Sequence, residues 1–139
     1  MQKIVIDTSV IISALIGKKG PSREILRQCL KGHHKPLISN ALFLEFEDVS
    51  TRSQILKLCP LSSKEINSLL CAFYSVTEWV PIYYLWRPNL LDENDNFLIE
   101  LAIAGNAEII VTNNTKDLKA AELSFENIQI LKPEHFLRG

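Results

Sequence analysis

Short apolar runs alternate with longer amphipathic stretches along this chain of 139 residues. The β-branched runs at residues 4–6 and 107–112 are typical of strands that are buried on both faces, as in a parallel sheet. Further strands are expected at 36–39, 77–84 and 128–131, with Pro81 favouring an edge position for the third of the five. Because strands and helices alternate, the pattern predicts one α/β domain over residues 1–139, with a largely parallel sheet.

Helices are expected wherever apolar residues recur every three or four positions. They span residues 10–16, 21–31, 41–50, 54–58, 63–75, 95–104, 118–123 and 133–137. Ser62 with Glu65 forms a capping box for one of them, and either Ser39 or Asn40 can cap another. On the helix at 95–104, the residues expected to face the core are Leu98, Ile99, Ala102 and Ile103.

Composition and charge argue against several classes of protein. The net charge is −1, so no global basic field attracts nucleic acid, and such binding would need a local patch or metal ions. Three cysteines without a C-x-x-C pair indicate reduced thiols rather than a zinc site. No signal peptide and no apolar stretch of membrane-spanning length is evident, which predicts a cytoplasmic protein with no membrane partner.

Three acids stand where apolar neighbours would carry them inward. Asp7 follows the first buried strand, Glu45 lies beside the apolar stripe of its helix, and Asp95 begins the helix at 95–104. Ligand sites of open α/β sheets lie at the carboxyl ends of the strands. Gathered there, carboxylates are expected to share a hard cation, Mg²⁺ or Mn²⁺, which suits phosphodiester hydrolysis.

Each acid also has a plain structural interpretation. Asp7 could cap the following helix or form a turn, Glu45 could be solvated, and Asp95 could serve only the helix dipole. The same holds for other chemistry-bearing residues: His33 and His34 fit a solvated turn. The aromatic residues Trp79, Tyr83, Tyr84 and Trp86 favour packing over base stacking.

Four segments, in order, resemble the PIN-domain family of metal-dependent ribonucleases, which includes many toxins of bacterial toxin–antitoxin pairs. They are I-V-I-D-T-S-V-I-I-S-A-L at 4–15, N-A-L-F-L-E-F-E-D-V at 40–49, D-E-N-D-N-F-L-I-E-L-A at 92–102 and I-I-V-T-N-N-T-K-D-L at 109–118. The segments 86–89 and 132–134 are similar to the toxin branch. The resemblance covers nearly the whole chain and implies a three-layer fold with a five-stranded sheet in the order 3-2-1-4-5.

The resemblance also implies roles for residues. Asp7, Glu45 and Asp95 match the family's first three acids, as metal ligands and catalytic residues. Asn114 stands where the family usually has a fourth acid, which removes one negative charge, and Asp117 could compensate as a metal ligand. The strand order implies that Asp7 and Asn114 flank one crevice at a topological switch point. Supporting roles are expected for Thr8, Ser9 and Thr112; helix capping is the alternative for Thr8 and Ser9.

The function implied is that of a Mg²⁺- or Mn²⁺-dependent endoribonuclease, with RNA as substrate and a small antitoxin protein as partner. Candidate contacts to the RNA backbone are Lys18, Lys19 and Arg87, and exposed aromatics suggest a homo-oligomer. One alternative is a PIN-fold binding module whose site is weakened at Asn114. Another is a small-molecule phosphatase, although Ser9 stands where the aspartyl-phosphate type needs a second Asp.

Overall fold

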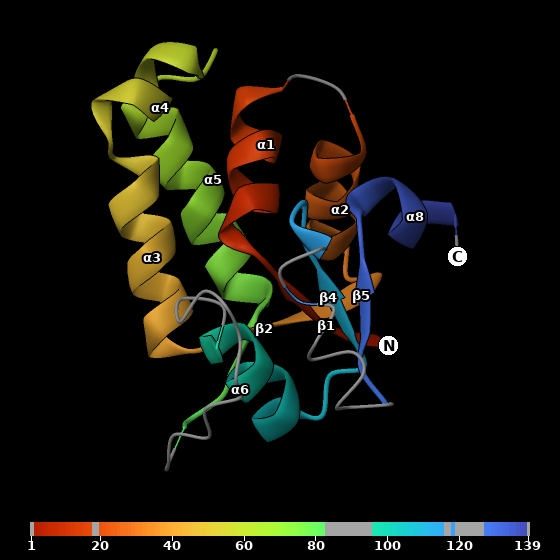
Figure 1. Ribbon diagram of the computed structural model, residues 1–139. Helices are drawn as coiled ribbons and strands as arrows, with labels where there is room; N and C mark the ends of the chain where they lie inside the picture. Colours follow the sequence, from red (N-terminus) through yellow and green to blue (C-terminus); the bar gives the residue numbers. More distant parts are fainter. Residues whose placement is uncertain (1, 18–19, 83–95, 116–117, 119–126, 139) are drawn as a thin grey trace.

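The protein is described by a computed structural model that covers residues 2–17, 20–82, 96–115, 118 and 127–138. Figure 1 shows the arrangement of its elements. The strands are β1 (Gln2–Ile6), β2 (His34–Ile38), β3 (Glu78–Trp79), β4 (Ile109–Val111) and β5 (Gln129–Leu131). The helices are α1 (Thr8–Ile16), α2 (Pro21–Leu30), α3 (Asn40–Ser50), α4 (Ser53–Leu58), α5 (Ser63–Val76), α6 (Asn96–Gly105) and α8 (Pro133–Arg138).

The five strands form one sheet in the order β3-β2-β1-β4-β5, and every neighbouring pair is parallel. The α/β class and the order 3-2-1-4-5 are therefore confirmed. Strand β1 pairs with β2 on one side and with β4 on the other, so the chain reverses its direction of winding at β1. The register aligns Ile6 with Val111, which brings the residues after both strands, Asp7 and Thr112, to the same edge.

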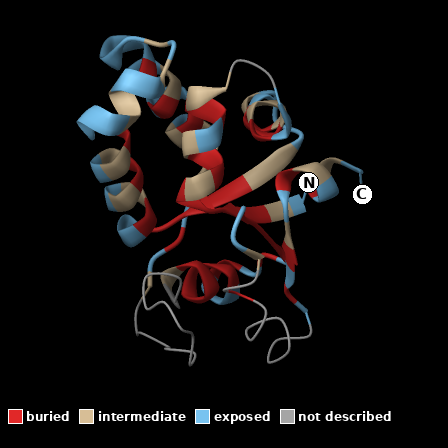
Figure 2. Cartoon of the chain, turned by 45° about the horizontal axis from the view of Figure 1, so that its top comes forward, coloured by how far each residue is buried: buried red, intermediate tan, exposed pale blue. Residues whose placement is uncertain are grey.

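Helices cover both faces of the sheet. Helix α6 lies on one face, whereas α1 and α2 lie on the other, with α3 and α5 beside α1 (Figure 1). The central strands have no exposed apolar side chain: Ile4, Val5, Ile110 and Val111 are each completely buried. Helix α6 is also buried along most of its length (Figure 2), because it packs directly on β1, β2 and β4. Continuous apolar runs in these segments thus reflect burial on both faces.

Helix ends follow the sequence closely. The Ser62 hydroxyl accepts a hydrogen bond from the Glu65 amide and the Glu65 carboxylate accepts one from the Ser62 amide, which is the expected capping box. At α3 the cap is Ser39, whose hydroxyl accepts a hydrogen bond from the Leu42 amide. Asn40 is instead the first residue of the helix.

Three details of the sequence prediction are wrong or lie outside the described residues. Strand β3 contains only two residues, and the segment from 80 to 82 is no longer paired as a strand. Ile103 is 40% exposed rather than buried, because it falls on the outer side of α6. Of the expected helix at 118–123, only Leu118 is described, and its side chain is buried.

The cysteines are free thiols, as expected. Burial raises the pKa of the Cys29 thiol to about 12, so this group stays protonated at neutral pH. Within the described segments, no helix combines the length and the apolar character that crossing a bilayer would require.

Gly105 at the end of α6 is required by close contact with the sheet. A Cβ atom at this position would lie 2.4 Å from Leu37 Cδ1 and 3.1 Å from Val80 Cγ2, and both side chains are buried. We expect Gly105→Ala to lower the free energy of unfolding by about 1–3 kcal/mol, as overpacked cores do. Urea denaturation would measure this. Ala104→Ser, at an exposed position of the same helix, is the control, and equal stability of both variants would contradict the packing argument.

Candidate active site

Asp7 occupies the carboxyl end of the central strand. It is the residue before α1, yet its side chain makes no capping hydrogen bond to that helix. The residue is 8% exposed, which is rare for a carboxylate. Its backbone amide donates to the Val111 carbonyl at 2.9 Å, which extends the pairing of β1 with β4 by one step. The Asp7 carboxylate therefore does not cap α1.

Two hydroxyl groups hold the Asp7 carboxylate. Thr112 Oγ1 donates to Asp7 Oδ2 at 2.6 Å, and Ser9 Oγ donates to the same oxygen at 3.1 Å. Each hydroxyl accepts a backbone hydrogen bond in turn, Thr112 from the Asn114 amide at 3.0 Å and Ser9 from the Asn113 amide at 3.3 Å. Since a hydroxyl that accepts a hydrogen bond becomes a stronger donor, this network fixes Asp7 Oδ2 and joins the ends of β1 and β4.

Glu45 is brought to the same edge by α3. The Thr8 hydroxyl donates a hydrogen bond to Glu45 Oε1. Thr8 is buried and directly follows Asp7, so two acids that are 38 positions apart in sequence are held by adjacent residues of one turn. Thr8 and Ser9 thus contact the two carboxylates with their side chains, while their backbone begins α1.

The two asparagines after β4 have different surroundings. Asn113 Nδ2 donates to the Ser9 carbonyl at 3.2 Å and to Ser13 Oγ at 3.1 Å, so its amide ties the loop to α1. Asn114 has an exposed side chain beside Thr112. Of the two, Asn114 is the one at the position that the resemblance assigns to the fourth acid, and its side chain is exposed.

Several predicted site residues lie outside the described residues. They are Asp95, Asp117, Lys18, Lys19 and Arg87. Within the described ranges, no three His, Cys, Asp or Glu side chains are close enough together to hold a metal ion. The structure therefore places Asp7 and Glu45, with their hydroxyl partners, and leaves the roles of the other acids as predictions.

The surroundings of Asp7 fit a bound cation. Among the described residues its side-chain partners are two neutral hydroxyls, and the ion pairs found there join other residues: Lys3–Glu78, Arg27–Glu24 and Arg52–Asp48. Oδ1 accepts no hydrogen bond from any described residue. A buried carboxylate with only neutral partners is costly, and oxygen donors of this kind suit Mg²⁺ or Mn²⁺. The donor set thus favours a hard divalent cation.

A second feature at this edge was missed by the sequence reasoning. Glu100 on α6 is 5% exposed and lines a cavity of about 490 Å³. Ser39, Trp79 and Phe97 also line it, so the cavity lies where β2 and β3 end. The available signal was a single charge inside the apolar run F-L-I-E-L-A-I-A, because a glutamate is almost never buried unless its carboxylate has a partner.

The PIN-domain family model matches residues 3–116. This chain belongs to the PIN-domain family. Its fold is also similar to VapBC2 from Rickettsia felis bound to a DNA fragment from their promoter, with a TM-score of 0.60 and 20% sequence identity. That match covers 94% of this chain and 98% of the other, and at such low identity it shows the fold alone. The sequence has no significant match among curated proteins.

The hydroxyl of Thr112 should be needed to hold the Asp7 carboxylate in this PIN domain. We expect Thr112→Val to lower the free energy of unfolding at pH 7 by about 1–3 kcal/mol, because a buried acceptor loses its donor. Thr112→Ser keeps the hydroxyl and serves as the control in the same urea titrations. A serine variant as unstable as the valine variant would assign the loss to the methyl group and contradict this account.

Proposed function

We propose that this PIN domain is a Mg²⁺- or Mn²⁺-dependent endoribonuclease that hydrolyses RNA phosphodiester bonds, as the toxin of a toxin–antitoxin pair. The observation that carries the proposal is the buried Asp7 carboxylate, held by neutral hydroxyls at the topological switch point of the sheet. Membership of the PIN-domain family supports the same chemistry.

In this proposal Asp7, Glu45 and Asp95 hold the metal, directly or through water, and Asn114 or Asp117 completes the site. The amide of Asn114 can contribute its carbonyl oxygen but no charge. A divalent ion held by these residues would supply an activated water and would neutralise charge on the phosphate. The site is acidic without the ion, so substrate phosphate would be repelled until the carboxylates are neutralised.

The role of the surrounding hydroxyls is to fix the carboxylates before substrate arrives. Thr112 and Ser9 hold Asp7 Oδ2, and Thr8 holds Glu45 Oε1. Because both acids are already oriented, the reaction requires little free energy to reorient them. The other carboxylate oxygen of Asp7, Oδ1, is the atom that we assign to the metal.

The partners proposed are RNA and a small antitoxin. RNA would contact Lys18, Lys19 and Arg87 through its phosphates. The antitoxin is proposed from the resemblance to the toxin branch and from the fold shared with VapBC2, whose structure contains promoter DNA. A cytoplasmic location and self-association are proposed as well.

A second candidate is a PIN-fold module that binds RNA or protein without cutting it. Asn114 favours this alternative, since it replaces an expected carboxylate with a neutral amide. A module of this kind would bind its RNA or protein equally well with and without divalent metal. If the natural protein cuts no RNA and the Asn114→Asp variant does, the binding module would be the better account of the natural protein.

Cleavage of a mixed single-stranded RNA pool in Mn²⁺ tests the proposal. We expect the wild-type protein to cut and EDTA to stop it. Asp7→Asn should reduce the rate by at least about 100-fold, because a charged ligand is replaced by a neutral one. Its fold should persist, with thermal stability equal to or above that of the wild type, because Asn keeps the shape and removes a buried charge.

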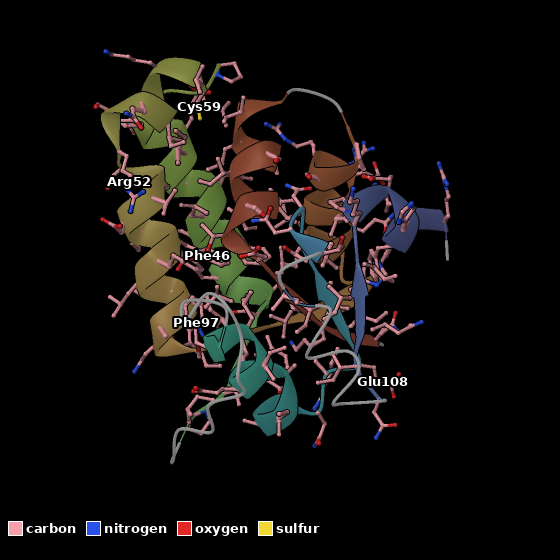
Figure 3. All side chains as sticks on the ribbon, in the orientation of Figure 1. Phe46, Arg52, Cys59, Phe97 and Glu108 are labelled. Atoms are coloured by element: carbon pink, nitrogen blue, oxygen red, sulfur yellow. The ribbon has the colours of Figure 1, made fainter. Side chains whose placement is uncertain are left out.

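The matched control is Glu108→Gln, which also converts a carboxylate to an amide. Glu108 is exposed and precedes β4, so it lies at the amino edge of the sheet, far along the strands from Asp7 (Figure 3). This variant should cut like the wild type. Full activity of a folded Asp7→Asn protein would refute the assigned site.

A further inference from the structure

We infer that Asn113 is a positioning residue of the metal site: its side chain anchors the loop after β4 to α1, and the anchored loop directs the Ser9 hydroxyl toward Asp7. This inference rests on the proposed function for the role of Asp7 as a metal ligand. It deepens that function by adding a residue that holds no metal itself. Neither the sequence pattern nor the family resemblance assigns a role to Asn113.

Among the described residues, three hydrogen bonds join Asn113 to the first turns of α1. Its side-chain nitrogen Nδ2 donates to the Ser9 carbonyl at 3.2 Å and to Ser13 Oγ at 3.1 Å, and its backbone amide donates to Ser9 Oγ at 3.3 Å. Ser13 Oγ also donates to the Ser9 carbonyl at 3.0 Å, which closes a ring of hydrogen bonds. Both donor positions of the Asn113 amide group are thus used. The loop is therefore attached to a helix that is about 100 positions away in sequence.

Ser9 is the residue through which Asn113 reaches the acid. Its hydroxyl donates to Asp7 Oδ2 at 3.1 Å while it accepts the hydrogen bond from the Asn113 backbone amide. A serine hydroxyl carries one proton and rotates freely, so the direction of that proton follows its partners. Because the Asn113 N–H occupies one lone pair, the proton of Ser9 is directed to Asp7. This contact is longer than the 2.6 Å contact from Thr112, so it depends more on such support.

The contacts of the Asn113 side chain lie on the surface of the molecule. Asn113 and Ser13 are both exposed, whereas Asp7 and Thr112 are buried. Removal of the Asn113 amide group therefore opens no cavity in the core. Any effect of this change on metal binding has to pass through the hydrogen bonds to Ser9 and Asp7. Groups that orient a ligand in this way commonly account for about 10–100-fold in metal affinity.

Calorimetric titration of Mn²⁺ into metal-free protein tests the inference without any cleavage. Asn113→Ala should weaken Mn²⁺ binding about threefold to tenfold, less than the loss of a group that contacts a ligand directly. Ser9→Ala removes the hydroxyl itself and should weaken Mn²⁺ binding by at least as much. In the Ser9→Ala background, Asn113→Ala should change the affinity by less than about twofold, because both changes act on one contact. An equal loss in both backgrounds would overturn the inference.

Asn127→Ala is the matched control for the loss of an asparagine amide. Asn127 is exposed and precedes β5, so it lies at the amino edge of the sheet, and its replacement should leave Mn²⁺ affinity unchanged. Urea denaturation of each variant separates stability from metal binding. A merely structural role would make Asn113→Ala easier to unfold but leave the Mn²⁺ affinity of its folded form equal to that of the wild type, and this result would also overturn the inference.

Amide hydrogen exchange in the metal-free protein is a second test that needs no ligand. The backbone amide at position 113 is present in every variant, and its bond to Ser9 Oγ should slow its exchange. Its protection factor, measured by NMR, should fall about fivefold or more in both Asn113→Ala and Ser9→Ala. Ser13→Ala, which removes one of the two acceptors of Asn113 Nδ2, should give a smaller decrease. Unchanged protection in Asn113→Ala would show that the side chain does not hold the loop.

The outcome is separable from that of the cleavage assay. Mn²⁺ binding that requires Asn113, in a protein that cuts no RNA, would retain the positioning role and reject the nuclease. Metal-dependent cutting by a protein whose Mn²⁺ affinity is the same with and without the Asn113 amide group would retain the nuclease and reject the positioning role. Absence of Mn²⁺ binding by the wild type would overturn this inference together with the metal site.

Discussion

The structure depends on the placement of one carboxylate at the carboxyl end of a strand that is buried on both sides. Asp7 directly follows β1, and the apolar residues before it fix its position along the sheet. The Val111 carbonyl at the end of the neighbouring strand β4 accepts a hydrogen bond from the Asp7 amide, and Thr112, directly after β4, donates one to the Asp7 side chain. Shifting β4 by one residue would turn the Thr112 side chain to the other face and remove this contact. The geometry of the site therefore depends on the register between β1 and β4.

Much of this arrangement was predictable from local signals. The β-branched runs before Asp7 and Thr112 identified the central strands, and the Ser62–Glu65 pair identified the start of α5. The strand order came from the family resemblance, because local patterns do not determine which strands become neighbours. Glu45 was placed beside the apolar stripe of its helix, but its contact with Thr8 depends on how α3 packs on α1.

Other features depend on contacts between distant segments and were not predictable. The run F-L-I-E-L-A-I-A does not indicate that Glu100 lines a cavity with Trp79, since Glu100 lies on a helix and Trp79 on a strand of the sheet. The exposure of Ile103 and the shortness of β3 likewise follow from how α6 and the sheet meet. The distinction between Asn113 and Asn114 required the observed hydrogen bonds, because both are polar residues after the same strand. Topology thus brings two acids, Asp7 and Glu45, and a cavity to one edge of the sheet.

The most direct measurement is calorimetric titration of Mn²⁺ into metal-free protein, comparing the wild type with Asp7→Asn and Glu108→Gln. If the buried carboxylate exists to hold a cation, Asp7→Asn should weaken Mn²⁺ binding by about 10–100-fold, the range seen when support of a metal site is lost. Glu108→Gln should bind as the wild type does. Equal Mn²⁺ affinity in the wild type and a folded Asp7→Asn variant would contradict the central claim, whatever RNA the protein binds.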